Sequence, residues 1–233
     1  MNITVVRFPG TNCEHDLVVT AKDIFGSTAS VISSSERSLP TNTDLLFLPG
    51  GFSYGDYLRP GAMAKICPIM KAIREFAGSG GRVVGICNGF QILCEAGLLP
   101  GVLLPNKTIK FLSRPVHVRV ENIENYVTGA LTVGDVIEMP VAHFDGNYFA
   151  EPHVLSEIEG NAQVVFRYCS PSGEVSADSS EWNPNGSCNA IAGVCNKERN
   201  VVGFMPHPER RIDLQKSKPG CSNHEHIRSL FTG

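Results

Sequence analysis

The sequence predicts an α/β fold, with a doubly wound and mostly parallel sheet to which antiparallel strands are added. In residues 1–101, short apolar segments alternate with segments whose apolar residues recur at helical spacing. This alternation is typical of parallel strands covered by helices. From about residue 102 to 204 the character changes to strand-like segments separated by turns, which favours antiparallel strands that extend the sheet and add a layer to it.

In the first part of the chain we expect the order β-α-β-β-α-β-α. Asn12 or Thr11 can cap the first helix, Gly26 ends it, and Pro60 suits the first turn of the second helix. The third strand is apolar throughout, so we expect both of its faces to be buried. The expected elements are strands at 3–8, 29–32, 44–48 and 82–86, and helices at about 12–25, 60–76 and 88–96.

The second part of the chain is expected to be mostly strands, followed by one helix near the C-terminus. The expected elements are strands at 113–120, 135–140, 162–168, 188–195 and 201–204, and a helix at 223–231. The sequence has no internal repeat, low-complexity tract or obvious linker. We therefore expect residues 1–233 to form a single domain.

The composition is that of an ordinary globular protein, with 42% hydrophobic and 18% charged residues. A net charge of -3 gives no electrostatic argument for nucleic acid or an anionic membrane as a partner. No segment approaches the roughly 20 apolar residues of a membrane span, and no signal-peptide pattern is visible, so we expect a cytoplasmic location. The eight cysteines are scattered without zinc-ligand spacing, which predicts free thiols and no metal site.

Cys87 stands out because it ends an apolar, β-branched segment in the pattern Gly85-x-Cys87-x-Gly89 and precedes a helical pattern. A nucleophile elbow is such a tight strand-to-helix turn, and it presents the reactive side chain at the edge of a sheet. Glycine is expected at both flanking positions because a Cβ there would clash with a neighbouring strand or helix. The following helix N-terminus would favour the thiolate.

His207 and Glu209 follow another apolar strand in the run Met-Pro-His-Pro-Glu. Two residues apart on an extended segment, their side chains can point the same way. A thiol, an imidazole and a carboxylate suit acyl transfer, with Cys87 as nucleophile, His207 as base and then acid, and Glu209 as the group that orients the ring. The candidate oxyanion donors are the backbone N–H of Asn88 and that of the turn containing Gly51.

Other polar residues can be interpreted either as structural or as functional. Cys13 can line the same cleft, but a buried thiol at a helix start is the expected role, and Cys94 is expected to be a packing residue. Asp56 is either functional or a turn former. His143 and Asp145 follow a strand and face either the cleft or solvent.

The motifs around Cys87 and His207 resemble those of the class I, or triad, glutamine amidotransferases. The stretch Gly51-Phe-Ser-Tyr-Gly-Asp56 and further segments between residues 8 and 210 are similar, more narrowly, to the glutaminase subunits of phosphoribosylformylglycinamidine synthase. This resemblance implies a flavodoxin-like core and hydrolysis of glutamine through a glutamyl thioester on Cys87. It also implies an oxyanion hole of Gly51 and Asn88, and substrate contact by Gln91.

The same resemblance implies a division of labour between subunits. The ammonia passes to a larger synthetase subunit, which uses ATP and Mg to convert formylglycinamide ribonucleotide to the amidine in purine biosynthesis, and a further small subunit completes the complex. No cofactor is expected in this chain, which has no P-loop. The sequence departs from the family at His143-Phe-Asp-Gly-Asn-Tyr148, where Gly-Glu-Gly often follows the histidine.

Two alternatives remain open at this point. One is a class I glutaminase that serves another synthase or acts as a free-standing γ-glutamyl hydrolase. The other is a catalytically idle regulatory subunit that keeps the fold. The Gly-Gly-Phe-Ser-Tyr-Gly-Asp stretch argues against the first, and the presence of all three residues Cys87, His207 and Glu209 argues against the second.

Overall fold

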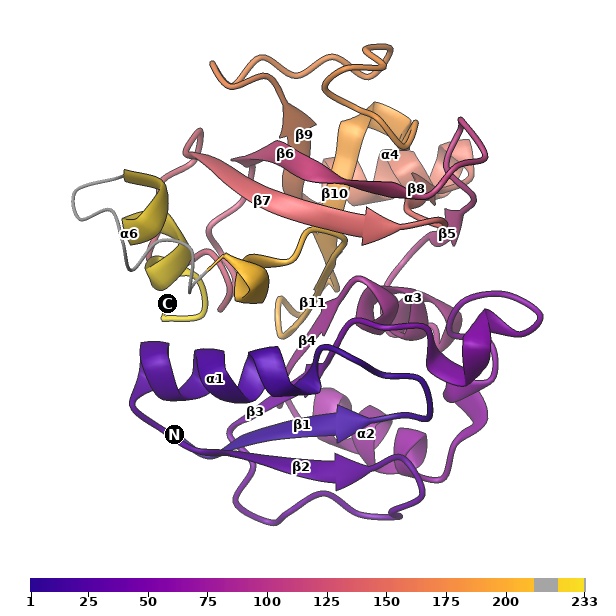
Figure 1. Ribbon diagram of the computed structural model, residues 1–233, viewed down its shortest axis with the longest axis vertical. Helices are drawn as coiled ribbons and strands as arrows, with labels where there is room; N and C mark the ends of the chain where they lie inside the picture. The colour runs from indigo at the N-terminus through magenta and orange to yellow at the C-terminus, as the bar shows by residue number, and fades with distance from the viewer. Residues whose placement is uncertain (212–221, 233) are drawn as a thin grey trace.

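Nine strands form one mixed sheet in the order β2-β1-β3-β4-β11-β10-β9-β6-β7 in the computed structural model, which describes residues 1–211 and 222–232 (Figure 1). The strands are β1 Ile3–Arg7, β2 Ala29–Ser33, β3 Leu45–Leu48, β4 Arg82–Ile86, β5 Val102–Leu104, β6 Leu112–Val120, β7 Val136–His143, β8 Asn147–Phe149, β9 Val164–Cys169, β10 Ile191–Cys195 and β11 Val201–Phe204. The α-helices are α1 Glu14–Phe25, α2 Ile69–Gly78, α3 Asn88–Glu95, α4 Pro152–Gly160 and α6 Ser222–Ser229. Short 3₁₀ helices are η1 Ser53–Asp56, η2 Ala64–Ile66, η3 Cys188–Ala190 and η4 Pro208–Arg210.

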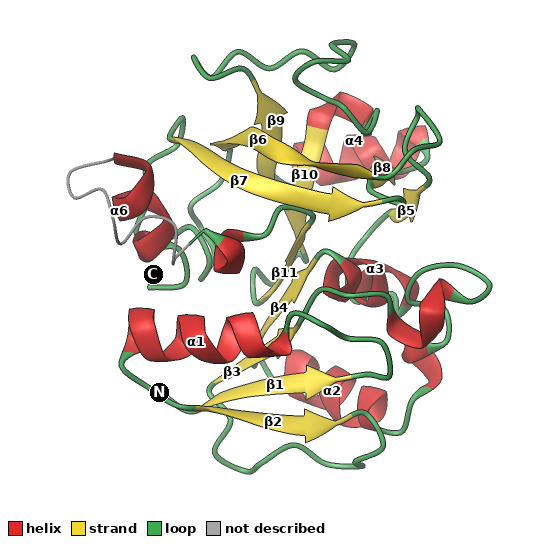
Figure 2. Cartoon of the chain, viewed as in Figure 1, coloured by secondary structure: helices red, strands yellow, loops and turns green. Residues whose placement is uncertain are grey.

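The parallel half of the sheet confirms the predicted fold class. Strands β2, β1, β3, β4 and β11 are parallel neighbours. The chain leaves β1 toward β2 and leaves β3 toward β4 in opposite directions along the sheet, so right-handed crossovers place α1 and α2 on opposite faces. Figure 2 shows this arrangement, with α1 in front of the strands and α2 behind them. All four residues of β3 are buried, as expected for a central parallel strand.

The antiparallel half continues the same sheet, with β10, β9, β6 and β7 joined edge to edge. The expected strand over 188–195 is shorter, because residues 188–190 form η3 with Asn189 and Ala190 at positive φ. A separate two-stranded sheet pairs β5 with β8. Neither these two short strands nor α4 was expected from the sequence.

The helix expected over 60–76 is wrong in its first half. Gly61 has φ +79° and packs so closely on α3 that a Cβ there would lie 2.9 Å from Gln91 C and Ile92 Cα. Cys67 is extended, with ψ 150°, because a residue before proline avoids the helical region, and α2 begins only after Pro68. Residues 60–67 therefore form turns and η2.

The first helix is as expected apart from its cap. Neither Thr11 nor Asn12 caps α1, because Cys13 occupies the N-cap position without a side-chain hydrogen bond. The Thr11 hydroxyl instead accepts a hydrogen bond from Phe8 N at 3.0 Å, and Asn12 Oδ1 accepts one from the Cys13 thiol at 3.1 Å. The two side chains shape the turn after β1 rather than the helix end.

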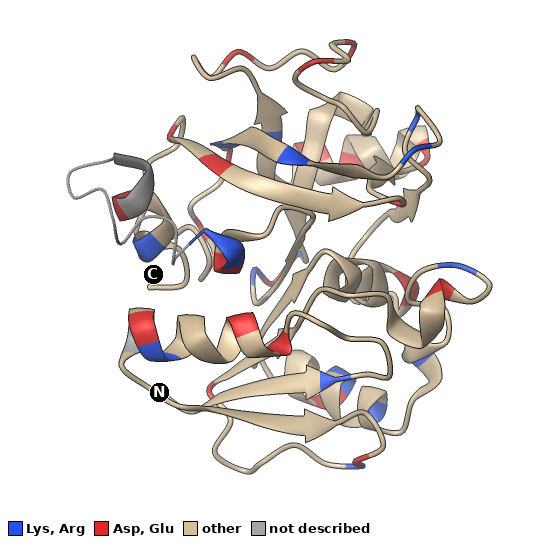
Figure 3. Ribbon diagram, viewed as in Figure 1, with Lys and Arg blue, Asp and Glu red and all other residues tan. Residues whose placement is uncertain are grey.

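Charged residues of both signs are spread over both halves of the molecule (Figure 3). Among the described helices, none is long and apolar enough to cross a membrane. That residues 1–233 form a single domain stays a prediction.

Candidate active site

The carboxyl ends of three neighbouring strands meet at one edge of the sheet and bring the candidate residues together. Parallel pairing sets Leu48 of β3 opposite Gly85 of β4, and Phe204 of β11 opposite Ile86 of β4. The segments that follow these strands therefore leave the sheet side by side. They carry Gly51, Cys87 and His207, at the edge where open α/β sheets bind their ligands.

Cys87 has the backbone of a nucleophile elbow. Its φ is 51° and its ψ is -105°, a strained conformation for a residue with a Cβ. Two backbone hydrogen bonds hold it, one from Cys87 N to Phe204 O at 2.8 Å and one from Gln91 N to Cys87 O at 3.1 Å. The helix α3 begins at the next residue, so the thiol lies at a helix N-terminus.

The glycines that flank Cys87 are required by packing, as predicted. A Cβ on Gly89 would lie 1.9 Å from Leu48 O of the neighbouring strand. A Cβ on Gly85 would lie 2.6 Å from the backbone of Gly89. The turn is thus as tight as the sequence pattern implied, because strand and helix cross without room for side chains.

His207 and Glu209 form a buried pair. Their Nδ1 and Oε1 atoms lie 2.6 Å apart, and each side chain is about 1% exposed. Burial lowers the pKa of His207, but the Glu209 carboxylate, the Cys87 sulfur and Cys13 outweigh burial and raise this pKa well above its ordinary value. His207 Nε2 is buried and has no hydrogen-bond partner among the described residues. One ring nitrogen is therefore held by the carboxylate, and the other is free to exchange a proton.

A cavity of about 560 Å³ contains both reactive groups, Cys87 and His207. A volume of this order suits a small-molecule substrate. Cys87 Sγ lies 3.8 Å from Ala142 O of β7, so the far end of the antiparallel half forms one wall. The complete lining is Asn12, Gly51, Phe52, Gly55, Asp56, Cys87, Gln91, Phe111, Ala142, His143, Phe144, Asp145, His207 and Arg210.

Gly51 belongs to this cavity, where it forms a bridge with Thr11. Residues 11 and 51 form an isolated antiparallel bridge whose bonds run from Asn12 N to Gly50 O and from Phe52 N to Gly10 O. The bridge does not use the N–H of Gly51 itself. Gly51 has φ +145°, and a Cβ would lie 2.7 Å from Gly10 O, so the turn needs glycine.

Asn88 and Gln91 connect the elbow helix to the cavity walls. Asn88 is buried, and its side chain accepts a hydrogen bond from Ser53 N at 3.0 Å and donates to Gln91 Oε1 at 2.8 Å. Gln91 lines the cavity and donates to Asp145 O at 2.6 Å. Asn88 is not among the residues that line the cavity, and its backbone N–H lies at the first turn of α3, next to Cys87.

Two carboxyl groups, Asp56 and Asp145, face the same cavity. Burial and the nearby Asp145 raise the pKa of Asp56 to about 6, and burial raises the pKa of Asp145. The structure thus assigns Asp145, together with His143, to the cleft rather than to solvent, and Asp56 lines the same cleft. Asp56 also has φ 54°, so it is both a turn residue and a cavity residue.

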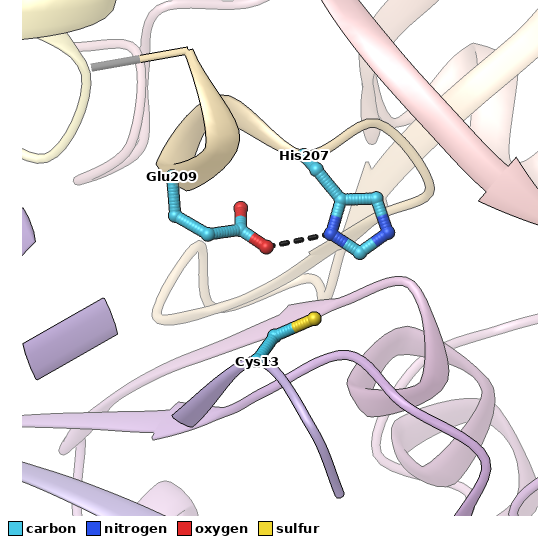
Figure 4. A group of neighbouring side chains, drawn as sticks. All are labelled: Cys13, His207 and Glu209. Carbon is cyan, nitrogen blue, oxygen red and sulfur yellow. Dashed lines mark hydrogen bonds and ion pairs between the residues drawn. The ribbon is translucent and has the colours of Figure 1, made fainter. Parts of the chain in front are cut away.

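Cys13 lies beside the His207–Glu209 pair (Figure 4). Its thiol is fully buried at the start of α1, as expected, and Arg210 Nη2 lies 2.9 Å from its sulfur. One ligand atom from each of Cys13, His207 and Glu209 lies within 4.8 Å of the others, a spacing that could hold a metal ion. The guanidinium on Cys13 disfavours a further cation at this position.

Several cavity residues were not singled out from the sequence as parts of the site, namely Asn12, Phe52, Gly55, Phe111, Ala142, Phe144 and Arg210. Arg210 directly follows the run Met-Pro-His-Pro-Glu, so its closeness to His207 in the sequence was a usable signal. Phe111 comes from the segment between β5 and β6, and no local pattern connects it to Cys87.

Comparison with known proteins agrees with this geometry. The profile of the CobB/CobQ-like glutamine amidotransferase domain matches residues 1–231. The phosphoribosylformylglycinamidine synthase subunit PurQ of Sulfurimonas denitrificans is 48% identical over 91% of this chain and 92% of its own length. The protein of the same description from Rhodopseudomonas palustris is 47% identical over 100% of this chain and 96% of its own length.

Solved structures give the same result. The structure of PurLQS from Thermotoga maritima contains a chain with a TM-score of 0.81 and 36% identity, covering 99% of this chain and 96% of that one. A glutamine amidotransferase from the same organism, at 14% identity and a TM-score of 0.59 over 99% of this chain and 96% of its own, shares the fold. The chain therefore belongs to the CobB/CobQ-like glutamine amidotransferase family and, within it, to the PurQ subunits of phosphoribosylformylglycinamidine synthase.

Proposed function

We propose that this chain is the glutaminase subunit of phosphoribosylformylglycinamidine synthase, and that it releases ammonia from glutamine through a thioester on Cys87. The observation that carries the proposal is the elbow itself. Cys87, held at φ 51°, lines the same cavity as His207, whose Nδ1 is bound to Glu209 and whose Nε2 has no partner within the described part of the chain. The high identity to PurQ subunits supports the choice of synthase.

In the proposed acylation, the Cys87 thiolate attacks the side-chain amide carbon of glutamine. The negative charge passes to the amide oxygen, which the backbone N–H groups of Gly51 and Asn88 stabilise. The carbon–nitrogen bond then breaks as imidazolium Nε2 of His207 gives its proton to the leaving nitrogen, and ammonia departs. Glu209 stabilises the imidazolium and holds the ring in place.

In the proposed deacylation, His207 removes a proton from a water molecule, which attacks the thioester carbon. The carbon–sulfur bond breaks, Cys87 leaves as the thiolate, and glutamate is released. Gln91 is proposed to contact the substrate from the start of α3. Its bond to Asp145 O fixes its side chain at the cavity wall, which supports this role.

The ammonia is proposed to pass to a larger synthetase subunit that binds ATP, with a further small subunit in the complex. The PurLQS structure, which contains the related chain, supports this assembly. A cytoplasmic location belongs to the same proposal, and it is supported by the free thiols of seven cysteines within the described residues.

The test is ammonia release from glutamine by the purified chain, with and without the synthetase subunit, ATP and formylglycinamide ribonucleotide. Native protein is compared with Cys87→Ala, and with Cys94→Ala as the matched control, because Cys94 lies on the same helix outside the cavity. We expect weak release by the chain alone, a rise with the loaded partner, and loss only in Cys87→Ala. Equal rates with and without the partner would point to another synthase or a free-standing hydrolase, and no release in any mixture would favour an idle subunit.

A further inference from the structure

The side chain of Asn106 fixes the protonation of a second histidine in the cavity, His143. Asn106 is fully buried, and its Nδ2 donates to two carbonyl oxygens, Lys110 O at 2.8 Å and His143 O at 3.0 Å. Its Oδ1 accepts from the backbone N–H of Gly146 at 3.1 Å. Carbonyl oxygens only accept and a backbone N–H only donates, so the amide has a single consistent orientation.

This orientation selects one tautomer of His143. His143 Nδ1 lies 3.1 Å from Asn106 Oδ1, and because that oxygen can only accept, Nδ1 carries the proton. Burial and the nearby His207 lower the pKa of His143 to about 3, so the ring is neutral at physiological pH. His143 Nε2 therefore has no proton and is a hydrogen-bond acceptor.

This acceptor has no donor among the described residues. His143 Nε2 is buried, and the residue is 4% exposed and lines the cavity that holds Cys87 and His207. The ring packs directly on Gly146, where a Cβ would lie 2.1 Å from His143 Cε1. A buried acceptor without a donor is costly, so a position of this kind indicates a ligand that supplies the missing N–H or O–H.

The position of His143 indicates which part of the substrate this is. His143 directly follows Ala142, whose carbonyl oxygen lies 3.8 Å from Cys87 Sγ. His143 and His207 line the same cavity, and the charge of His207 contributes to the lowered pKa of His143. The acceptor thus lies at the reacting end of the cavity, where glutamine brings an amide nitrogen with two hydrogens.

We propose that His143 Nε2 accepts a hydrogen bond from the side-chain amide nitrogen of glutamine and so orients the leaving group toward His207. The inference rests on the proposed glutaminase function and adds a specificity-determining residue to it. With one N–H held by His143, the lone pair that forms on nitrogen in the tetrahedral intermediate turns toward the proton on His207 Nε2. The site then favours an amide over an ester, whose leaving oxygen has no hydrogen to donate.

The test compares two substitutions, His143→Asn and His143→Gln, in the full chain with its synthetase subunit. Asparagine places an N–H near the position of Nδ1 and keeps the bond to Asn106, but it has no acceptor near the position of Nε2. Glutamine places its amide near Nε2 and loses the bond to Asn106. Each is assayed as kcat/KM for L-glutamine and for the γ-methyl ester of L-glutamate, which form the same thioester.

We expect His143→Asn to lower kcat/KM for glutamine by about tenfold, the effect of one lost hydrogen bond, and to change the value for the ester by less than about twofold. His143→Gln should retain more activity on glutamine than His143→Asn. Equal losses on both substrates, or the reverse order of the two variants, would assign a purely structural role to His143 and overturn the proposal. A native protein that hydrolyses neither substrate would reject the glutaminase function itself.

A second measurement does not depend on turnover. In the Cys87→Ala protein labelled with ¹⁵N-histidine, the imidazole resonances of His143 should show protonated Nδ1 and bare Nε2. Adding L-glutamine should move the Nε2 resonance upfield, as hydrogen bonding to a bare ring nitrogen does, and L-glutamate γ-methyl ester should not. A protonated Nε2, or an equal shift with both ligands, would contradict the assignment.

Discussion

Glu209 Oε1 lies 2.6 Å from Nδ1 of His207, and both side chains are almost completely buried. A short bond between a carboxylate and an imidazole away from water holds the ring in one orientation and raises its pKa. The other ring nitrogen then faces the cavity without a partner among the described residues. The Glu209 carboxylate does not contact the substrate, but it thus controls the proton on His207 that is given to the substrate.

Glu209→Gln removes the charge and keeps a hydrogen-bond acceptor of the same shape. Because the Glu209 carboxylate raises the pKa of His207, its loss should lower this pKa, so the imidazolium deprotonates at lower pH. We expect kcat for glutamine hydrolysis to fall by about 10²-fold and the basic limb of the pH–rate profile to move to lower pH. Initial rates across a pH series, with exposed Glu36→Gln as control, measure both. An unmoved basic limb would contradict this role.

Selective alkylation should identify Cys87 as the reactive thiol. A chloroketone analogue of glutamine is expected to modify Cys87, which lines the cavity, and to leave Cys13 and Cys195, which have no exposed surface. Cys188 is partly exposed, but burial raises the pKa of its thiol, so it should react slowly. Peptide mapping by mass spectrometry, with and without excess glutamine as protectant, gives the order of reaction. Modification of Cys188 ahead of Cys87 would refute the prediction.

Gly89→Ala should destabilise the protein, because the new Cβ would lie 1.9 Å from Leu48 O and neither the strand nor the helix can move away freely. We expect the free energy of unfolding to fall by about 2–3 kcal/mol. Gly78→Ala in α2 is the matched control, since nothing lies within 4 Å of its Cβ and alanine favours a helix by about 0.5–1 kcal/mol. Urea unfolding of both variants checks the difference, and an equal stability of the two would show that the elbow tolerates a side chain.

Asp56→Asn should stabilise the protein at neutral pH. The pKa of Asp56 is about 6 in the folded protein against 3.8 for the unperturbed group, so the folded state binds the proton more tightly. Stability is therefore lost as pH rises from about 4 through 6, and asparagine avoids this loss. We expect a gain on the order of 1 kcal/mol above pH 7, after allowance for solvent screening at this half-buried group, and little change near pH 4.

Thermal unfolding of Asp56→Asn and native protein between pH 4 and 8 measures this effect. Asp178→Asn is the control, because its side chain is exposed and lies outside the cavity. If the stability difference between Asp56→Asn and native protein does not depend on pH, the surroundings of Asp56 do not raise the pKa of its carboxyl.

The amino-acid pattern alone was enough to predict most of the parallel half of the fold and the three residues proposed to act on glutamine. The strand before Cys87, its two flanking glycines and the helix after it lie within one short segment. The steric demand of such a turn is local, so it leaves a local pattern. His207 and Glu209 were also expected to point the same way, but on an extended segment, whereas Glu209 lies in the 3₁₀ helix η4 that directly follows His207.

The tertiary structure decided how the rest of the cavity is built. Arg210 contacts Cys13, 197 residues away in sequence, and Asn106 binds His143 across 37 residues. Similarly, the order β10-β9-β6-β7 joins strands that lie far apart in the sequence. Periodicity shows which side of an element is apolar but not which partner covers it, because that choice depends on contacts made only when the chain closes.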